Sequence, residues 1–240
     1  MRRALAFLTP LGRAGAPTPS TFNWFPLVGA VIGLAVGGVW WLADRAWAPV
    51  VAAAVTVVTD ALLTGGLHLD GLADAADGLL PPMDKARRLR VLRDPAVGAF
   101  GGVALVTVLL LRFGVFTTTP ARPLLVAALW CGSRTAMAVM ARSMPYARPE
   151  GGLVTAFVTS SDGDPGPMAE HRFHWAAGSV FSAVGGVVLA VGLAAVGAEA
   201  VAVAAVGWLA WRRIGGFTGD VLGAAGVIGE TVGLLVMSAK

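Results

Sequence analysis

Residues 48–78 read APVVAAAVTVVTDALLTGGLHLDGLADAADG, an apolar run followed at once by a segment that carries Asp70, Asp74 and Asp77. The run up to Leu67 contains a single charged residue, Asp60. It is long enough to cross a bilayer as a helix, which takes about 20 residues. Three carboxylates therefore follow directly on a membrane span, and both the fold and the site must account for them.

Composition places the whole chain in the membrane. The 240 residues are 56% hydrophobic and 13% charged, with a mean hydropathy of +0.74, whereas soluble domains contain about 25% charged residues. Only helices and closed barrels satisfy their backbone in lipid, and these runs lack the alternation of barrel strands. We expect an all-α polytopic integral membrane protein in which residues 1–240 form one membrane-embedded domain.

Seven apolar segments predict about six or seven transmembrane helices. The last two are close together in the sequence and could form one broken helix. The lone Cys131 excludes a disulfide framework and a cysteine metal cluster. The segments are residues 24–43, 49–67, 99–118, 124–141, 175–197, 200–213 and 217–237.

The distribution of Lys and Arg predicts the orientation. With the N-terminus in the cytoplasm, 13 of the 18 basic residues fall in cytoplasmic segments, 3 outside and 2, Arg112 and Arg134, within spans. Cytoplasmic loops of membrane proteins carry such an excess. The larger polar segments, 68–98 and 142–174, both fall on this side. We therefore expect the active site to face the cytoplasm.

The three aspartates form one acidic stripe if their segment is helical. At about 100° per residue they fall within about 60° of arc. Carboxylates this close repel one another, and a divalent cation relieves that repulsion. Oxygen-only ligands suit Mg²⁺, Mn²⁺ or Ca²⁺, so Asp70, Asp74 and Asp77 are the predicted metal ligands. The alternative is a solvated polar face. His68 falls on the opposite side and is not expected to bind metal.

A basic segment, DKARRLRVLRDPAVGAFGG at residues 84–102, follows the stripe. Residues 85–90 fit topology-setting charge or attraction to anionic lipid. Arg93 and Asp94 precede a proline and a glycine cluster, which favours a tight return into the membrane near the stripe. A metal, basic groups and close backbone approach are the parts of a phosphoryl-transfer site. Arg93 is a predicted substrate ligand and Asp94 a predicted general base, with Asp77 as the other candidate base and a metal role for Asp94 left open.

Other polar residues complete the predicted site. Arg134 lies inside an apolar run, where a charge is usually functional, and it is expected to bind phosphate or to pair with a structural acid. Asp60 and Arg112 are expected to form a structural ion pair. His171 and His174 are read as surface residues. The remaining predicted substrate-binding residues are Tyr146, Arg148, Asp220 and Glu230.

The block TGGLHLDGLADAADG resembles the signature of the cobalamin synthase family, bacterial membrane enzymes also called adenosylcobinamide-GDP ribazoletransferases. FPLVGAVIG, LRDPAVGAFGG, GSRTA, YARPEGG and GGFTGDVLGA, followed by Glu230, resemble further blocks of that family in the same order. The resemblance covers nearly the whole chain and implies a single catalytic domain in the bacterial inner membrane.

The resemblance also implies a reaction. Adenosylcobinamide-GDP and α-ribazole, or its 5′-phosphate, would give adenosylcobalamin, or its 5′-phosphate, and GMP, with Mg²⁺ as cofactor. The substrates and the lipid bilayer are then the partners, nucleic acid is not, and a homo-oligomer is left open.

Two alternatives remain at this point. A CDP-alcohol phosphotransferase also uses aspartates at a membrane surface, but here Asp70-Gly71 is followed by Ala73-Asp74 rather than Ala-Arg. A small-molecule transporter would use the intramembrane charges, yet the acidic residues gather at one face.

Overall fold

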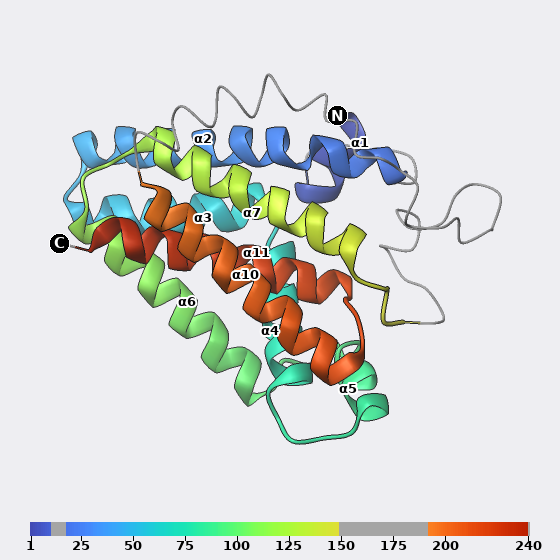
Figure 1. The fold of residues 1–240 in the computed structure, drawn as a ribbon. Coiled ribbons are helices and arrows are strands. Elements are labelled where there is room, and N and C mark those ends of the chain that lie inside the picture. Colours follow the sequence, from blue (N-terminus) through green and yellow to red (C-terminus); the bar gives the residue numbers. More distant parts are fainter. Residues whose placement is uncertain (11–17, 149–191, 240) are drawn as a thin grey trace.

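The computed structural model describes residues 1–10, 18–148 and 192–239, and in these ranges the fold is all-helical (Figure 1). The only strand-like pairing within them is an isolated bridge between Tyr146 and Phe217. The elements are α1 Arg2–Leu8, the 3₁₀ helix η1 Pro19–Trp24, α2 Phe25–Ala46, α3 Pro49–Leu63, α4 Leu67–Leu79, α5 Lys85–Val91, α6 Ala99–Thr118, α7 Pro123–Ser143, α10 Leu193–Ile214 and α11 Gly219–Ser238.

Five helices of the described ranges are long and apolar enough to cross a membrane: Ser20–Ala46, α6, α7, α10 and α11. The pair α3 and α4 would make a sixth span, bent by 87° at its break. This agrees with a polytopic membrane protein.

Two of the predicted segment boundaries are wrong. Residues 49–67 do not form one helix, because Gly65 (φ 59°) and Gly66 (φ 71°) adopt left-handed conformations between α3 and α4. The predicted span 175–197 lies mostly outside the described residues, but α10 already begins at Leu193, so residues 193–199 belong to the following helix.

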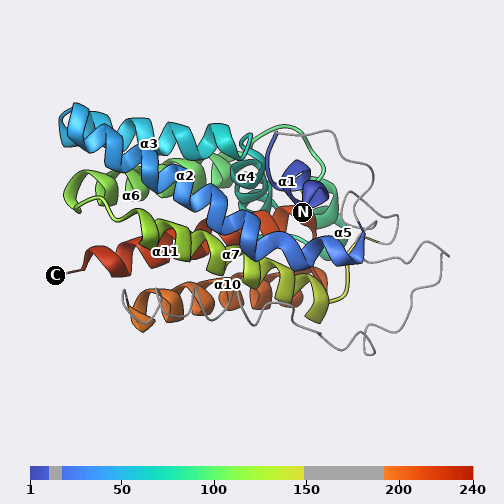
Figure 2. The ribbon, with the colours of Figure 1, turned by 90° about the horizontal axis from the view of Figure 1, so that it is seen from above.

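The alternative of one broken helix near the C-terminus is also wrong. Gly215 (φ 78°) ends α10 in a left-handed turn, and α11 runs back along it as a separate helix (Figure 2). α7 and α11 are each 67% buried over their apolar windows, whereas α6 and α10 are 28% buried. α7 and α11 therefore form the centre of the bundle, and α6 and α10 present wide faces to the outside.

α2 and α7 pack closely because α2 carries glycine at every fourth position. A Cβ on Gly33 would lie 2.7 Å from Trp130 Cβ and 2.7 Å from the Val126 carbonyl oxygen. A Cβ on Gly37 would lie 2.6 Å from Pro123 Cα. Small residues in this spacing let membrane helices approach to backbone contact.

The glycine stripe gives a matched pair of variants. Gly33→Ala inserts a methyl group against backbone atoms of α7, and we expect it to destabilise the fold by about 1–3 kcal/mol through overpacking. Gly38→Ala, five residues further along α2, enters open space and should be neutral or slightly stabilising. Thermal unfolding of the two variants in the same detergent tests this. Equal melting temperatures would show that α2 and α7 are not held by this contact.

Candidate active site

α4 carries the acidic stripe as predicted. Between Asp70 and Leu79, only Asp70, Asp74 and Asp77 are not buried, so the open face of this helix is made of the three aspartates. His68 lies on the other face and is 3% exposed. The spacing argument for a helical acidic stripe is confirmed.

Glycine contacts bring the start of α11 against α4. A Cβ on Gly71 would lie 2.9 Å from the Asp220 carbonyl oxygen, and one on Gly223 would lie 3.3 Å from His68 Cα. This close approach puts Asp220 beside the stripe. Asp220, Asp70 and Arg148 are the strongest electrostatic neighbours of Asp74.

Arg148 is the cation of this group. Its Nη2 donates to Asp220 Oδ2 at 2.5 Å and to the Leu92 carbonyl oxygen at 2.8 Å. Thr218 caps α11 and also donates to Asp220 Oδ2 at 3.1 Å. The structure thus gathers four of the predicted site residues, Asp70, Asp74, Arg148 and Asp220, at one end of the bundle.

The loop after α7 is fixed to the turn before α11. The backbone N–H of Phe217 donates to the Pro145 carbonyl at 3.0 Å, and that of Ala147 donates to the Phe217 carbonyl at 2.9 Å. The Tyr146 ring packs edge-on against Phe217, with centroids 5.5 Å apart. Tyr146 therefore helps to hold Arg148 in place. Both residues were predicted to bind substrate.

Asp77 has a second task that the sequence did not suggest. Its Oδ2 accepts from the Gly98 N–H at 2.7 Å and its Oδ1 accepts from the Gly101 N–H at 3.0 Å. Both carboxylate oxygens therefore cap the N-terminus of α6, where backbone donors lack helical partners.

Arg93 and Asp94 lie exposed in the turn between α5 and α6. Asp94 Oδ1 accepts from the Ala96 N–H at 3.0 Å within that turn. Arg88, by contrast, is 2% exposed, and its Nη1 donates to the carbonyls of Gly78 and Leu79 at 2.9 and 2.8 Å. A residue expected to set topology instead closes the C-terminal end of α4.

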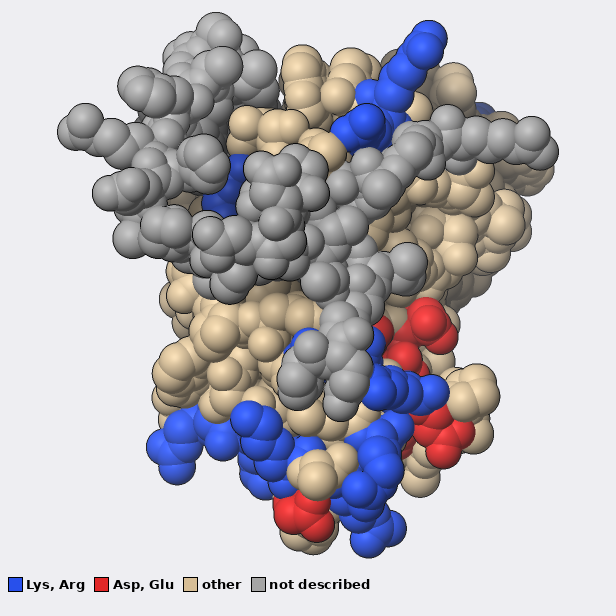
Figure 3. All heavy atoms as spheres, turned by 90° about the vertical axis from the view of Figure 1, so that its right-hand side faces the viewer, with Lys and Arg blue, Asp and Glu red and all other residues tan. Residues whose placement is uncertain are grey.

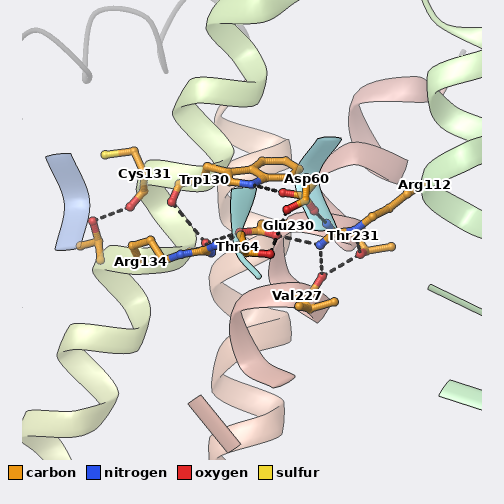
Figure 4. Close-up of polar contacts among 11 residues, drawn as sticks. Asp60, Thr64, Arg112, Trp130, Cys131, Arg134, Val227, Glu230 and Thr231 are labelled. Carbon is orange, nitrogen blue, oxygen red and sulfur yellow. Dashed lines mark hydrogen bonds and ion pairs between the residues drawn. The ribbon is translucent and has the colours of Figure 1, made fainter. Parts of the chain in front are cut away.

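Arg134 and Glu230 lie in a buried network rather than on the acidic stripe (Figure 4). The two are 1% exposed and form an ion pair, and Ser133 Oγ donates to Glu230 Oε1 at 2.7 Å. Arg112 Nη2 donates to Glu230 Oε2 at 2.7 Å. Both positions remain predicted substrate ligands, now with structural partners.

The predicted Asp60–Arg112 ion pair is confirmed. Arg112 Nη1 donates to Asp60 Oδ2 at 2.6 Å, and Trp130 Nε1 donates to Asp60 Oδ1 at 2.9 Å. Arg112 Nε donates to Thr231 Oγ1 at 2.9 Å. Sequence reasoning did not find Trp130, Ser133 or Thr231, because an uncharged polar residue in an apolar run carries no pairing signal.

Glu199 was also missed. This residue of α10 is 2% exposed, and neither of its carboxylate oxygens has a hydrogen-bond partner within the described ranges. The only sequence signal was a single acid inside an apolar run.

Metal binding by the three aspartates of α4 stays a prediction. Within the described ranges, no group of three or more His, Cys, Asp or Glu side chains has the geometry to hold a metal ion. The carboxylates of Asp70 and Asp74 form no hydrogen bond or ion pair within the described ranges. Each carboxylate oxygen of Asp77 accepts one backbone N–H and keeps a further lone pair, so all three aspartates remain predicted ligands.

A family model described as cobalamin-5-phosphate synthase matches residues 1–238. The chain belongs to this family. A family member from Chlorobaculum parvum, called adenosylcobinamide-GDP ribazoletransferase, is 38% identical over 244 residues, which cover 95% of this chain and 89% of the relative. Relatives of the same name from Escherichia coli O17:K52:H18 and Citrobacter koseri are 38% and 37% identical, each covering 89% of this chain and 85% of the relative. No solved structure matches.

Replacing Asp77 separates its capping role from chemistry. Asp77→Ala removes both acceptors and should lower the unfolding free energy of the protein by about 0.5–2 kcal/mol, as loss of a helix cap does. Asp77→Asn keeps one acceptor oxygen and should retain most of the stability. Thermal unfolding measures the stability of both variants. Asp74→Ala is the control, because it removes a carboxylate that caps no helix. A stable Asp77→Ala protein would contradict the capping role.

The buried network predicts strong coupling between Arg134 and Glu230. Glu230→Leu leaves two buried arginines without their shared acid, and we expect a loss of about 3–5 kcal/mol. Adding Arg134→Leu removes one orphaned charge and should recover part of that loss. A double-mutant cycle of unfolding free energies checks this, and strictly additive effects would argue against the ion pair.

Proposed function

We propose that this chain joins adenosylcobinamide-GDP to α-ribazole, or to α-ribazole 5′-phosphate, and releases GMP. The ribose 3′-hydroxyl oxygen forms a bond to the phosphorus attached to the cobinamide side chain. The phosphoanhydride bond to that phosphorus breaks, GMP leaves, and the hydroxyl proton passes to a base. The product is adenosylcobalamin or its 5′-phosphate.

The family match over residues 1–238 carries this proposal. The relatives named for this reaction cover nearly all of the chain, and they favour it over a CDP-alcohol phosphotransferase or a transporter. The geometry agrees, because carboxylates and a guanidinium gather at one end of a membrane bundle, where a polar phosphorylated substrate has access.

We further propose that Asp70 and Asp74, together with Asp77 on the same face of α4, hold Mg²⁺. Two uncommitted carboxylates with Asp220 beside them offer the oxygen-only donor set that Mg²⁺ prefers. When bound, the ion supplies positive charge to the pyrophosphate and stabilises the departing GMP. Arg148 and Arg93 are the cations of this chain that we assign to the phosphates.

Asp94 is the proposed general base. It lies on an exposed turn separate from α4, so it can approach the substrate from another side. A carboxylate within hydrogen-bond reach accepts the proton as the new bond to phosphorus forms. We propose that the end of the bundle with the acidic stripe faces the cytoplasm and that the protein lies in the inner membrane. The excess of basic residues at this end supports the orientation.

GMP release from adenosylcobinamide-GDP and α-ribazole tests the activity directly. Purified protein in detergent should release GMP only with both substrates and added Mg²⁺. Asp70→Asn and Asp74→Asn should each lower the rate by about two orders of magnitude or more, with unchanged thermal unfolding. Near-normal turnover in both variants would leave the stripe as a solvated face.

The same assay distinguishes a base from a ligand. Raising Mg²⁺ should partly rescue Asp74→Asn, whereas Asp94→Asn should stay slow at saturating Mg²⁺ and lose the acid-side fall of the pH–rate profile. Full recovery of Asp94→Asn at high Mg²⁺ would make Asp94 a metal ligand and leave the base unassigned.

A further inference from the structure

Basic side chains from α5 and from the end of α10 meet at one surface. A Cβ on Gly215, directly after α10, would lie 3.0 Å from Lys85 Nζ, and Arg213 is close enough to Arg88 to affect it electrostatically. Figure 3 looks onto this end and shows basic side chains spread over its lower part. We call this the α5–α10 basic surface, and its exposed members are Lys85, Arg87, Arg90, Arg212 and Arg213.

The positive charge of this surface is not neutralised within the described ranges. None of its five members forms an ion pair there. Asp84, which caps α5 through the Arg87 N–H at 2.8 Å, is the acid beside it. That hydrogen bond and nearby Arg90 hold the pKa of Asp84 below its usual range, so one negative charge faces five positive ones.

The α10 half of the surface borders an exposed apolar face. Trp208 and Trp211, within one turn of Arg212, are 60% and 51% exposed, and Arg212 Cζ lies 5.3 Å from the Trp208 ring centroid. Further along α10, Val201 and Leu193 are 70% and 68% exposed. Exposed tryptophans next to an exposed apolar face mark the level of the lipid headgroups, so the arginines lie where headgroup phosphates lie.

The basic surface is separate from the acidic stripe. Arg148 is the arginine that acts most strongly on Asp74 and Asp220, and no member of the basic surface is among their main electrostatic partners. The proposed substrate site therefore has its own cation, and the charge on α5 and α10 is available to a different ligand.

We propose that the α5–α10 basic surface binds the headgroup of an anionic phospholipid. The ligand is a phosphodiester with a net negative charge, such as phosphatidylglycerol, whose acyl chains lie along the exposed face of α10. Each basic residue at a membrane surface raises the affinity for anionic lipid roughly fivefold. Binding here joins the short helix α5, and through buried Arg88 the end of α4, to the membrane surface.

Lipid selectivity of the full chain tests this without any substrate. The protein is reconstituted in phosphatidylcholine vesicles, and the association of spin-labelled phosphatidylglycerol is compared with that of spin-labelled phosphatidylcholine. Arg212→Gln with Arg213→Gln should lower the preference for phosphatidylglycerol by at least fivefold. Arg45→Gln with Arg122→Gln removes the same charge at the other end of the bundle and should leave the preference unchanged.

Three results would overturn the proposal. The first is an unchanged preference for phosphatidylglycerol in the variant with both Arg212 and Arg213 replaced, and the second is an equal loss of that preference in the Arg45 and Arg122 control. The third is displacement of the labelled lipid from the unmodified protein by GDP, which would assign the surface to a nucleotide. If the glutamine variant does not fold, Arg87→Gln with Arg90→Gln should show the loss, and Arg212→Lys with Arg213→Lys should keep the preference. Each reading is independent of GMP release, so it stands or fails apart from the proposed reaction.

Discussion

The ion pair between Arg112 and Glu230 fixes how the helices of this bundle meet. Arg112 comes from α6 and Glu230 from the central helix α11, and each binds one further charged residue, Asp60 of α3 and Arg134 of α7. Two acids and two bases balance in a region where an unpaired charge is expensive. Breaking one buried pair costs about 3–5 kcal/mol, so sliding any of these four helices by one turn would be strongly opposed. The network therefore sets the register of the bundle.

That register decides where the acidic helix lies. Asp60 anchors the end of α3, and Gly65 and Gly66 then allow the 87° bend into α4. On the far side of α4, Gly71 contacts the start of α11, the same helix that carries Glu230. α4 is thus held between two elements that the network has already placed, and its one open face must carry the aspartates.

Hydropathy and spacing predicted the fold class, the helical acidic stripe and the Asp60–Arg112 pair, because each depends on local pattern or on a charge that must find a partner in lipid. Hydropathy and spacing could not predict which acid pairs with Arg134, since a charge inside a membrane span indicates only that some partner is needed. The cap formed by Asp77 and the burial of Arg88 depend on the approach of α6 and α5 to α4, which no periodicity encodes. The start of α10 was missed because the predicted segments 175–197 and 200–213 were divided next to Glu199, whereas α10 runs through this residue from Leu193 and buries it.

The three aspartates of the stripe differ in how firmly the protein holds their carboxylates. At the C-terminal end of α4, Asp77 is tied to two N–H groups of α6, and the last carbonyls are tied to Arg88. These contacts and the Gly71 contact with α11 prevent α4 from rotating its carboxylates apart. Asp70 and Asp74 must therefore keep their mutual repulsion in the folded state. Only positive charge arriving from outside the helix can relieve it, and Arg148, already shared between Asp220 and the Leu92 carbonyl, supplies it in part. A rigid helix with two partly compensated carboxylates fits the Mg²⁺ proposed for this site, because preorganised charge of this kind is what phosphoryl transfer uses.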